Sequence, residues 1–169
     1  MLDHFRMFAD YNRWANRRLL AALDAMSDED WHRDAGLFFR SVHGTFNHLL
    51  VADRVWFSRF AGDAWMPEGL DVILHEDRAE LIEARGEMDE TIRAHVGALG
   101  DDELDGEFTY TPVTDPTPVT QKLAPALAHV FNHHTHHRGQ IHAATTRFID
   151  VSPAIDLIYF QRARRLGEA

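Results

Sequence analysis

The histidines of this chain are concentrated in one stretch whose spacing suits metal chemistry. Residues 123–148 hold six of the twelve histidines. Steps of three and four residues along this stretch trace an apolar stripe in which imidazoles occupy core positions, and this pattern predicts one long helix. His133 and His137 lie four residues apart, so one helical turn brings both imidazoles to the same face, where they can bind one metal ion.

A second pairing and a third ligand have to be considered. His129 and His133 are also four residues apart, and the spacing alone leaves that alternative chelate open. A transition-metal site normally takes a further ligand from another element. His48 lies beside the apolar stripe of an earlier predicted helix, where its neighbours one turn away, Gly44 and Ala52, leave space around an inward-pointing imidazole. The candidate metal ligands are therefore His48, His133 and His137.

Three polar residues on the predicted inner helix faces need partners, because unpaired polar groups are costly to bury. Asp53 follows the candidate ligand of its helix by one turn. Its carboxylate is expected to accept a hydrogen bond from a ligand histidine, from Arg138 or from Trp56, or to form a partly exposed ion pair. Asn12 and Asn16 in the first helix are expected either to reach the metal end of the cavity or to make capping or interhelical hydrogen bonds.

The other polar residues of the histidine-rich helix are expected around the site. His134 adjoins the buried stripe, so both a functional and a structural role remain open for it. His136 lies on a flank, as a hydrogen-bond partner of a ligand or as a surface residue, and His142 is expected to be solvated. Close helix packing and orientation of the ligand imidazoles are expected from Arg138, Gly139 and Gln140.

Composition excludes several classes of protein. A formal net charge of -10 argues against binding to nucleic acid or to an anionic membrane surface. With no cysteine, the chain offers no thiolate ligand, so any metal must be held by His, Asp or Glu. Charges run throughout the first 20 residues and no long apolar run follows, so we expect no signal peptide, no membrane span and a cytoplasmic location.

The apolar spacing predicts the elements that position these residues. Long helices are expected over about 2–26, 41–60, 74–99 and 123–148. Residues 27–30 are expected to form either a turn or the cap of a short helix that ends near Gly36. A last helix over 154–166 is expected behind a Ser152-Pro153 cap. Residues 62–72 form a connection, and 105–121 an ordered loop with room for a short hairpin. We therefore expect a single all-α domain over residues 1–169, an up-down four-helix bundle with an additional short C-terminal helix.

Three stretches resemble a known family. They are NHHTHHRGQI at 132–141, FNHLLVADRVWF at 46–57 and YNRWANRRLLAAL at 11–23. Together they resemble the DinB/YfiT-like family of small bacterial proteins, and the resemblance covers nearly the whole chain. It implies a four-helix bundle that carries one divalent metal, nickel or zinc, on three histidines, which correspond here to His48, His133 and His137. It also implies a homodimer, and we expect exposed apolar residues of the first helix or of the loop around Trp65 to supply the contact. A translesion DNA polymerase that shares the family name is unrelated, and the length and acidic charge of this chain argue against that activity.

Two classes of function follow. Three neutral histidines leave coordination positions for water or substrate, which is typical of a catalytic site. Relatives in the wider superfamily use low-molecular-weight thiols, so the first hypothesis is a metal-dependent enzyme, a thiol-dependent transferase or a hydrolase acting on a small molecule. The alternative is a non-catalytic protein whose metal is structural or sensory, favoured by the lack of an obvious general base beside the ligands.

Overall fold

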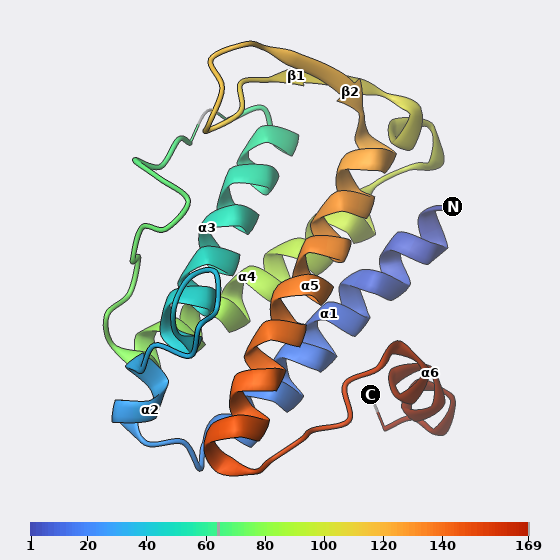
Figure 1. The fold of residues 1–169 in the computed structure, drawn as a ribbon. Coiled ribbons are helices and arrows are strands. Elements are labelled where there is room, and N and C mark those ends of the chain that lie inside the picture. The colour runs from blue at the N-terminus through green and yellow to red at the C-terminus, as the bar shows by residue number, and fades with distance from the viewer. Residues whose placement is uncertain (64, 169) are drawn as a thin grey trace.

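The computed structural model describes residues 1–63 and 65–168. Within them, four long helices pack as a bundle, with a short helix at one end and a C-terminal helix against its side (Figure 1). The helices are α1 (Leu2–Leu23), α2 (Asp28–His32), α3 (Val42–Phe60), α4 (Arg78–Ala98), the 3-10 helix η1 (Asp101–Asp105), α5 (Leu123–Ile149) and α6 (Leu157–Leu166). The predicted all-α bundle with an additional C-terminal helix is confirmed.

The order of helix directions differs from a simple up-down alternation. Both α1 and α3 pack beside α4 and α5. The starts of α3 and α4 lie together, since Asn47 donates a hydrogen bond to the carbonyl of His75, and their later parts also meet, where Phe57 contacts His95. Thus α3 and α4 run parallel, because the connection between them returns along the length of α3 (Figure 1). Residue 64 of this connection lies outside the described residues.

Serine side chains cap the first turns of α2 and α3. The Ser27 hydroxyl accepts the backbone N–H of Asp30 at 3.1 Å at the start of α2, and Ser41 accepts that of Gly44 at 3.0 Å at the start of α3. Each bond satisfies an amide that has no partner within the first helical turn.

Two other helix starts were predicted too early. Helix α4 begins at Arg78, where the Asp77 carboxylate accepts the amide of Glu80. Helix α6 begins after Asp156, and Ser152 does not cap it, because its hydroxyl lies 3.2 Å from Nε2 of His142.

Residues 105–121 were expected to form an ordered loop that could include a short hairpin, and a hairpin is present there. Strands β1 (Glu107–Tyr110) and β2 (Val119–Lys122) pair antiparallel, with Glu107 opposite Lys122. This hairpin lies between α4 and α5 in the chain and extends from the start of α5 over the end of α3, where Phe108 contacts Phe60 (Figure 1). None of the helices in the described part of the chain has both the length and the apolar character that a membrane crossing requires.

A buried polar layer interrupts the apolar core. Arg85 of α4 places Nη1 2.6 Å from Asp53 of α3 and Nη2 3.1 Å from Asp89 of its own helix. Asp89 also accepts hydrogen bonds from Asn12 and Asn16 of α1, at 3.0 and 2.9 Å. All five side chains are buried. Burial acts to lower the pKa of Arg85, but the carboxylates of Asp89 and Asp53 outweigh it and raise this pKa above its ordinary value.

Helix α5 completes the layer. His134 donates from Nε2 to Asp53 at 2.7 Å, and Arg138 donates to Asn12 and Asn16 while its guanidinium lies over the ring of Tyr11. Burial acts to raise the pKa of Asp53, but the contacts with His134 and Arg85 overcome it and lower this pKa to about 2. The layer therefore joins α1, α3, α4 and α5.

The loop before α3 lies close over the first turn of that helix. A Cβ added at Gly44 would collide with the backbone carbonyl oxygen of Phe39, so only glycine allows this approach. By contrast, a Cβ added at Gly86, which is exposed in the middle of α4, meets no atom within 4 Å.

These two glycines should respond in opposite directions to alanine. We expect Gly44→Ala to lower the free energy of unfolding by about 1–3 kcal/mol, because the loop must move away. Gly86→Ala should raise it by about 0.5–1 kcal/mol, because alanine favours the helix. Urea denaturation of both variants measures the difference, and an unchanged stability of Gly44→Ala would contradict the close approach.

Candidate metal centre

The three predicted ligand residues meet between α3 and α5. Nε2 of His48 lies 3.1 Å from Nε2 of His133, which lies 3.1 Å from Nε2 of His137. All three ring nitrogens lie within 4.8 Å of one another, so the group can hold a metal ion. Three nitrogens bound to a tetrahedral zinc ion at about 2.0–2.1 Å lie roughly 3.4 Å apart, close to the observed separations.

Hydrogen bonds at the opposite ring nitrogens orient two of these imidazoles. Nδ1 of His48 lies 2.8 Å from the carbonyl oxygen of Leu70, and Nδ1 of His137 lies 2.8 Å from Oε1 of Gln140. Because a carbonyl or amide oxygen can only accept, we assign the proton of each ring to Nδ1. The Nε2 lone pairs of His48 and His137 therefore face the centre of the group, as metal binding requires.

The local environment keeps the imidazoles neutral. Burial lowers the pKa of His133 to about 3, and the neighbouring His137 and His48 add to this effect. Burial lowers the pKa of His137 to about 4, although its hydrogen bond to Gln140 acts to raise it. The pKa of His48 is also lowered by burial, against the opposing effect of the Leu70 carbonyl. At neutral pH all three imidazoles are therefore uncharged, and their nitrogen lone pairs are available to a metal ion.

Without a cation, the hydrogen-bond pattern of this group is incomplete. Nε2 of His133 can carry at most one proton, and so can donate to only one of the two lone pairs that face it. In at least one of the two contacts of His133, with His48 or with His137, both Nε2 atoms then present a lone pair to each other at 3.1 Å. A cation bound among the three nitrogens removes this repulsion, and the residues present therefore fit a metal ion.

Two segments outside the long helices cover the site. The ring of Phe39 stacks on His48 with centroids 3.6 Å apart and lies 5.6 Å from the ring of His137. On another side, the segment before α4 supplies the carbonyl of Leu70. That segment is fixed by Asn47, whose Oδ1 accepts the backbone amides of residues 74 and 75 at 2.8 and 3.0 Å.

The remaining histidines of α5 lie outside the group. His129 is exposed and contacts Trp56, and it is not part of the group of histidines that could hold a metal ion. His136 is exposed, as the second of its two predicted positions requires, and it accepts a hydrogen bond from Gln140 and not from a ligand histidine. The prediction that His142 is solvated was wrong, because it is half-buried with Nε2 3.2 Å from the carbonyl of Pro153.

Several predicted partners of the site belong instead to the buried polar layer. Asp53 binds His134 and Arg85, not a ligand histidine, Arg138 or Trp56, and it is fully buried. Asn12 and Asn16 make interhelical hydrogen bonds to Asp89, which was one of the two alternatives expected for them. Their side chains are bonded in the buried polar layer and not to the three histidines.

Of the roles expected for the three residues after His137, only that of Gln140 is found. Gln140 orients a ligand imidazole, as expected. Arg138 instead anchors α5 to α1. The prediction that Gly139 allows close helix packing was wrong, because a Cβ added there meets no atom within 4 Å.

Sequence reasoning missed four contributors. Arg85 falls within the apolar stripe of its helix, four residues after Leu81 and four before Asp89, and this position is a signal that it is buried. The other three contributors are Phe39, Asn47 and the Leu70 carbonyl. Their contacts form because the segments before α3 and α4 fold back against α3, and the local spacing of residues does not predict such contacts.

We expect Asn47→Ala to weaken metal binding about 10- to 100-fold, because the segment that holds the Leu70 carbonyl loses its attachment to α3. The matched control is Asn132→Ala, an exposed asparagine next to His133 on α5. Competition with a chelator of known affinity measures both variants, with circular dichroism as the check on folding. Equal affinities for the two variants would show that this segment does not orient His48.

Comparison with known proteins identifies the family of the chain. A family model described as the DinB family matches residues 1–165. Protein DinB of Bacillus subtilis (strain 168) is 26% identical over 148 residues, an alignment that covers 82% of each chain. The family match spans the three stretches that first indicated the resemblance as well as the three histidines. The chain belongs to the DinB family.

Proposed function

We propose that this protein binds one divalent transition metal per chain through Nε2 of His48, His133 and His137. The observation that carries the proposal is the convergence of these nitrogens while the Nδ1 atoms of two rings are engaged elsewhere. An all-imidazole donor set suits zinc, nickel, copper and iron. The family resemblance favours nickel or zinc within that group.

We further propose that the bound metal serves a metal-dependent enzyme, a thiol-dependent transferase or a hydrolase. A metal on three imidazoles supplies a Lewis acid that lowers the pKa of a bound water or thiol. Since the chain has no cysteine, the thiol would come from a low-molecular-weight substrate. The stacked ring of Phe39 and the segment at Leu70 limit the access of water to the imidazole of His48.

The buried polar layer supports a functional metal over a purely structural one. The contacts among Asp53, Arg85, Asp89 and Asn16 join three of the long helices without using a ligand histidine. The apolar core is likewise formed by side chains of all four. The bundle is therefore held together by interactions that a metal does not supply.

One observation favours the alternative, a metal that is structural or sensory. Asp53, the buried carboxylate nearest to the ligands along α3, is engaged by His134 and Arg85 and is not free to accept a proton from a substrate. A catalytic reaction would then need its base from the substrate or from a metal-bound group.

A homodimer is part of the same proposal. Large apolar side chains are exposed at Ile158, Tyr159 and Leu166 on α6 and at Met66 in the connection before α4. Sedimentation velocity of the purified chain determines the state directly.

Elemental analysis of protein purified without a polyhistidine tag should find about one equivalent of metal per chain. His137→Ala should lose it, because only two of the three imidazoles remain. His142→Ala should keep it, because that ring binds the Pro153 carbonyl instead. Full metal content in His137→Ala would place the site elsewhere.

Removal of the metal by a chelator should leave the protein folded. We expect the chelated protein to keep its helical circular dichroism at 25 °C and to melt cooperatively, although at a lower temperature. Loss of the helical signal on chelation would support the structural alternative.

Metal affinity should change little between pH 7 and pH 5. Protons compete for Nε2 only where the imidazole is protonated, and the lowered pKa values of His133 and His137, about 3 and about 4, move that competition below pH 4. An imidazole with an ordinary pKa of about 6.5 would already compete at pH 5. Titration with a metal indicator across this range tests the prediction, and a loss of more than about tenfold per histidine would contradict it.

A further inference from the structure

A groove runs along the outer side of α5. It consists of three successive hollows, of about 430, 510 and 420 Å³, which lie between α5, the start of α1 and the segment before α6. Ala128 borders both the first and the second hollow, and Thr135 both the second and the third, so the hollows are continuous. In Figure 1 the groove lies between α5 (orange) and α1 (blue) and leads from the N-terminus to α6. The described residues that border it do not include the three candidate metal ligands.

The exposed side of α5 lacks acidic, lysine and arginine side chains. Over residues 123–146, all of which the structure describes, no exposed position carries Asp, Glu, Lys or Arg, and Arg138 is buried. A helix side that faces water normally carries such residues, whereas the centre of a protein interface is depleted of them. The composition of this side of α5 is therefore that of an interface.

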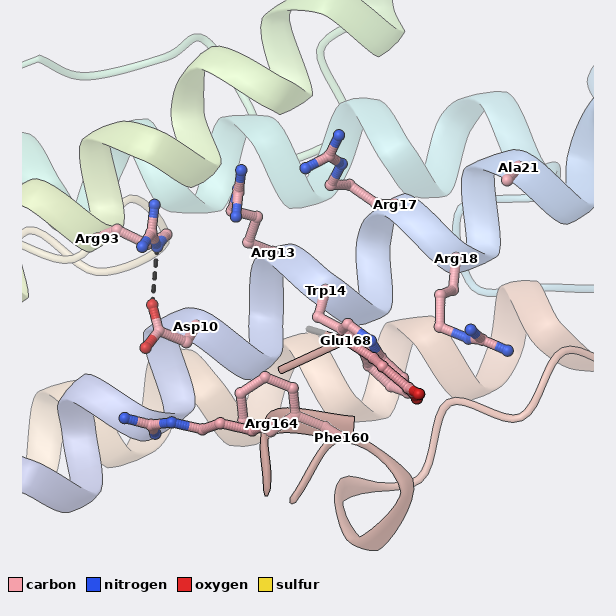
Figure 2. A pocket seen from close by; sticks show the side chains of 10 residues that line it. All are labelled: Asp10, Arg13, Trp14, Arg17, Arg18, Ala21, Arg93, Phe160, Arg164 and Glu168. Carbon is pink, nitrogen blue, oxygen red and sulfur yellow. Dashed lines mark hydrogen bonds and ion pairs between the residues drawn. The ribbon is translucent and has the colours of Figure 1, made fainter. Parts of the chain in front are cut away.

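The neighbouring helices show the contrast. On α1, Arg13, Arg17 and Arg18 project from the surface beside α6 (Figure 2). On α4, Glu83 and Glu87 are exposed. In a chain in which 26% of the residues are charged, a long helix without such exposed side chains needs a specific cause.

The middle hollow offers apolar surface to a partner. Its floor is formed by Phe5 and Phe131, whose rings stack with centroids 6.4 Å apart and which are 5% and 4% exposed. At its rim Met1 is 81% exposed, and Phe8 and Leu157 are half-buried. Covering the apolar rim removes it from water, which stabilises a complex.

Helix α6 projects at one end of the groove (Figure 1). Its side chains Ile158, Tyr159 and Leu166 are 45, 44 and 72% exposed, and Tyr159 also borders the third hollow. A recess and an apolar ridge therefore adjoin. A second copy of the chain can cover such a face, because a two-fold axis places the ridge of each copy over the recess of the other.

The two ends of the groove carry opposite charges. At the α6 end, Arg162 and Arg165 are exposed, and Arg162 lies over the ring of Tyr159. At the other end, Asp101 and Asp102 of η1 are exposed, and Asp101 borders the first hollow. None of these four charges forms an ion pair within the part of the chain that the structure describes. A two-fold axis perpendicular to α5 makes two α5 helices antiparallel and brings the arginines of each copy toward the aspartates of the other.

The size of this face suits a stable dimer. Helix α5 has 27 residues and is therefore about 40 Å long, at a rise of about 1.5 Å per residue. A contact of that length and about two helix diameters wide, roughly 20 Å, covers roughly 800 Å². Specific protein–protein interfaces bury about 800 Å² on each partner.

We propose that this face binds a second copy of the chain, with the two α5 helices antiparallel and each α6 over the η1 end of the other copy's groove. The helices then cross near Asn132, between Ala128 and Thr135, where the hollows join. This inference rests on the homodimer proposed above and adds the residues that form it. The two acidic chains repel each other, and contact through a helix side without acidic residues keeps that repulsion low.

Sedimentation equilibrium of Thr135→Arg and Thr91→Arg tests the proposal. The two threonines are matched, because both are exposed in the middle of a long helix and donate to the carbonyl four residues earlier, of Phe131 and Glu87, at 3.1 and 3.0 Å. We expect Thr135→Arg to weaken the dimer about tenfold or more, since two unpaired arginines would be buried close together. Thr91→Arg, on α4, should stay within about twofold of the unmodified chain.

Cross-linking locates the interface directly, because the chain has no cysteine of its own. A bismaleimide should join two copies of Thr135→Cys into a covalent dimer, since the antiparallel helices bring these positions close together on either side of the crossing point. Thr91→Cys should give little covalent dimer under the same conditions.

Circular dichroism and metal content, measured on the same variants, separate the interface from the fold and from the histidine group. A chain that stays monomeric would overturn this inference together with the proposed homodimer, but not the metal site. A dimer that Thr135→Arg leaves intact, or equal cross-linking of the two cysteine variants, would overturn this inference alone.

Discussion

The structure depends on the burial of charge between its helices. Arg85 lies between the carboxylates of Asp53 and Asp89 with almost no exposure to water. Such a group is costly to desolvate, and loss of one partner typically costs about 3–5 kcal/mol because the other charge is left uncompensated. The helices must therefore meet in the one register that satisfies these side chains. Together with Asn12, Asn16, His134 and Arg138, this layer aligns all four long helices.

That register also positions the candidate metal ligands. On α5, His133 and His137 form one row with a spacing of four, and His134 and Arg138 form a second row one residue later. The first row faces His48 and the second joins the buried layer. A shift of α5 against α3 would break both sets of contacts together. The buried layer thus provides the rigid support on which a three-imidazole site can be preorganised.

Segments without regular structure complete the site. The loop before α3 reaches the site because Gly44 lets the backbone of Phe39 approach, and the Phe39 ring covers His48. The connection before α4 is tied to Asn47 and presents the Leu70 carbonyl. Helices supply the candidate metal-binding nitrogens, while these segments decide the tautomer and the exposure of the His48 ring.

The sequence by itself determined the helices, the family and the three histidines, because the four-residue spacing on α5 and the apolar stripes are local properties of the chain. The tertiary structure alone decided which partner each polar group meets. The sequence places Asp53 on an inner helix face, but its burial and its pairing with Arg85 depend on how α3 and α4 are brought side by side. The parallel course of these helices depends on a long connection whose path no local pattern encodes.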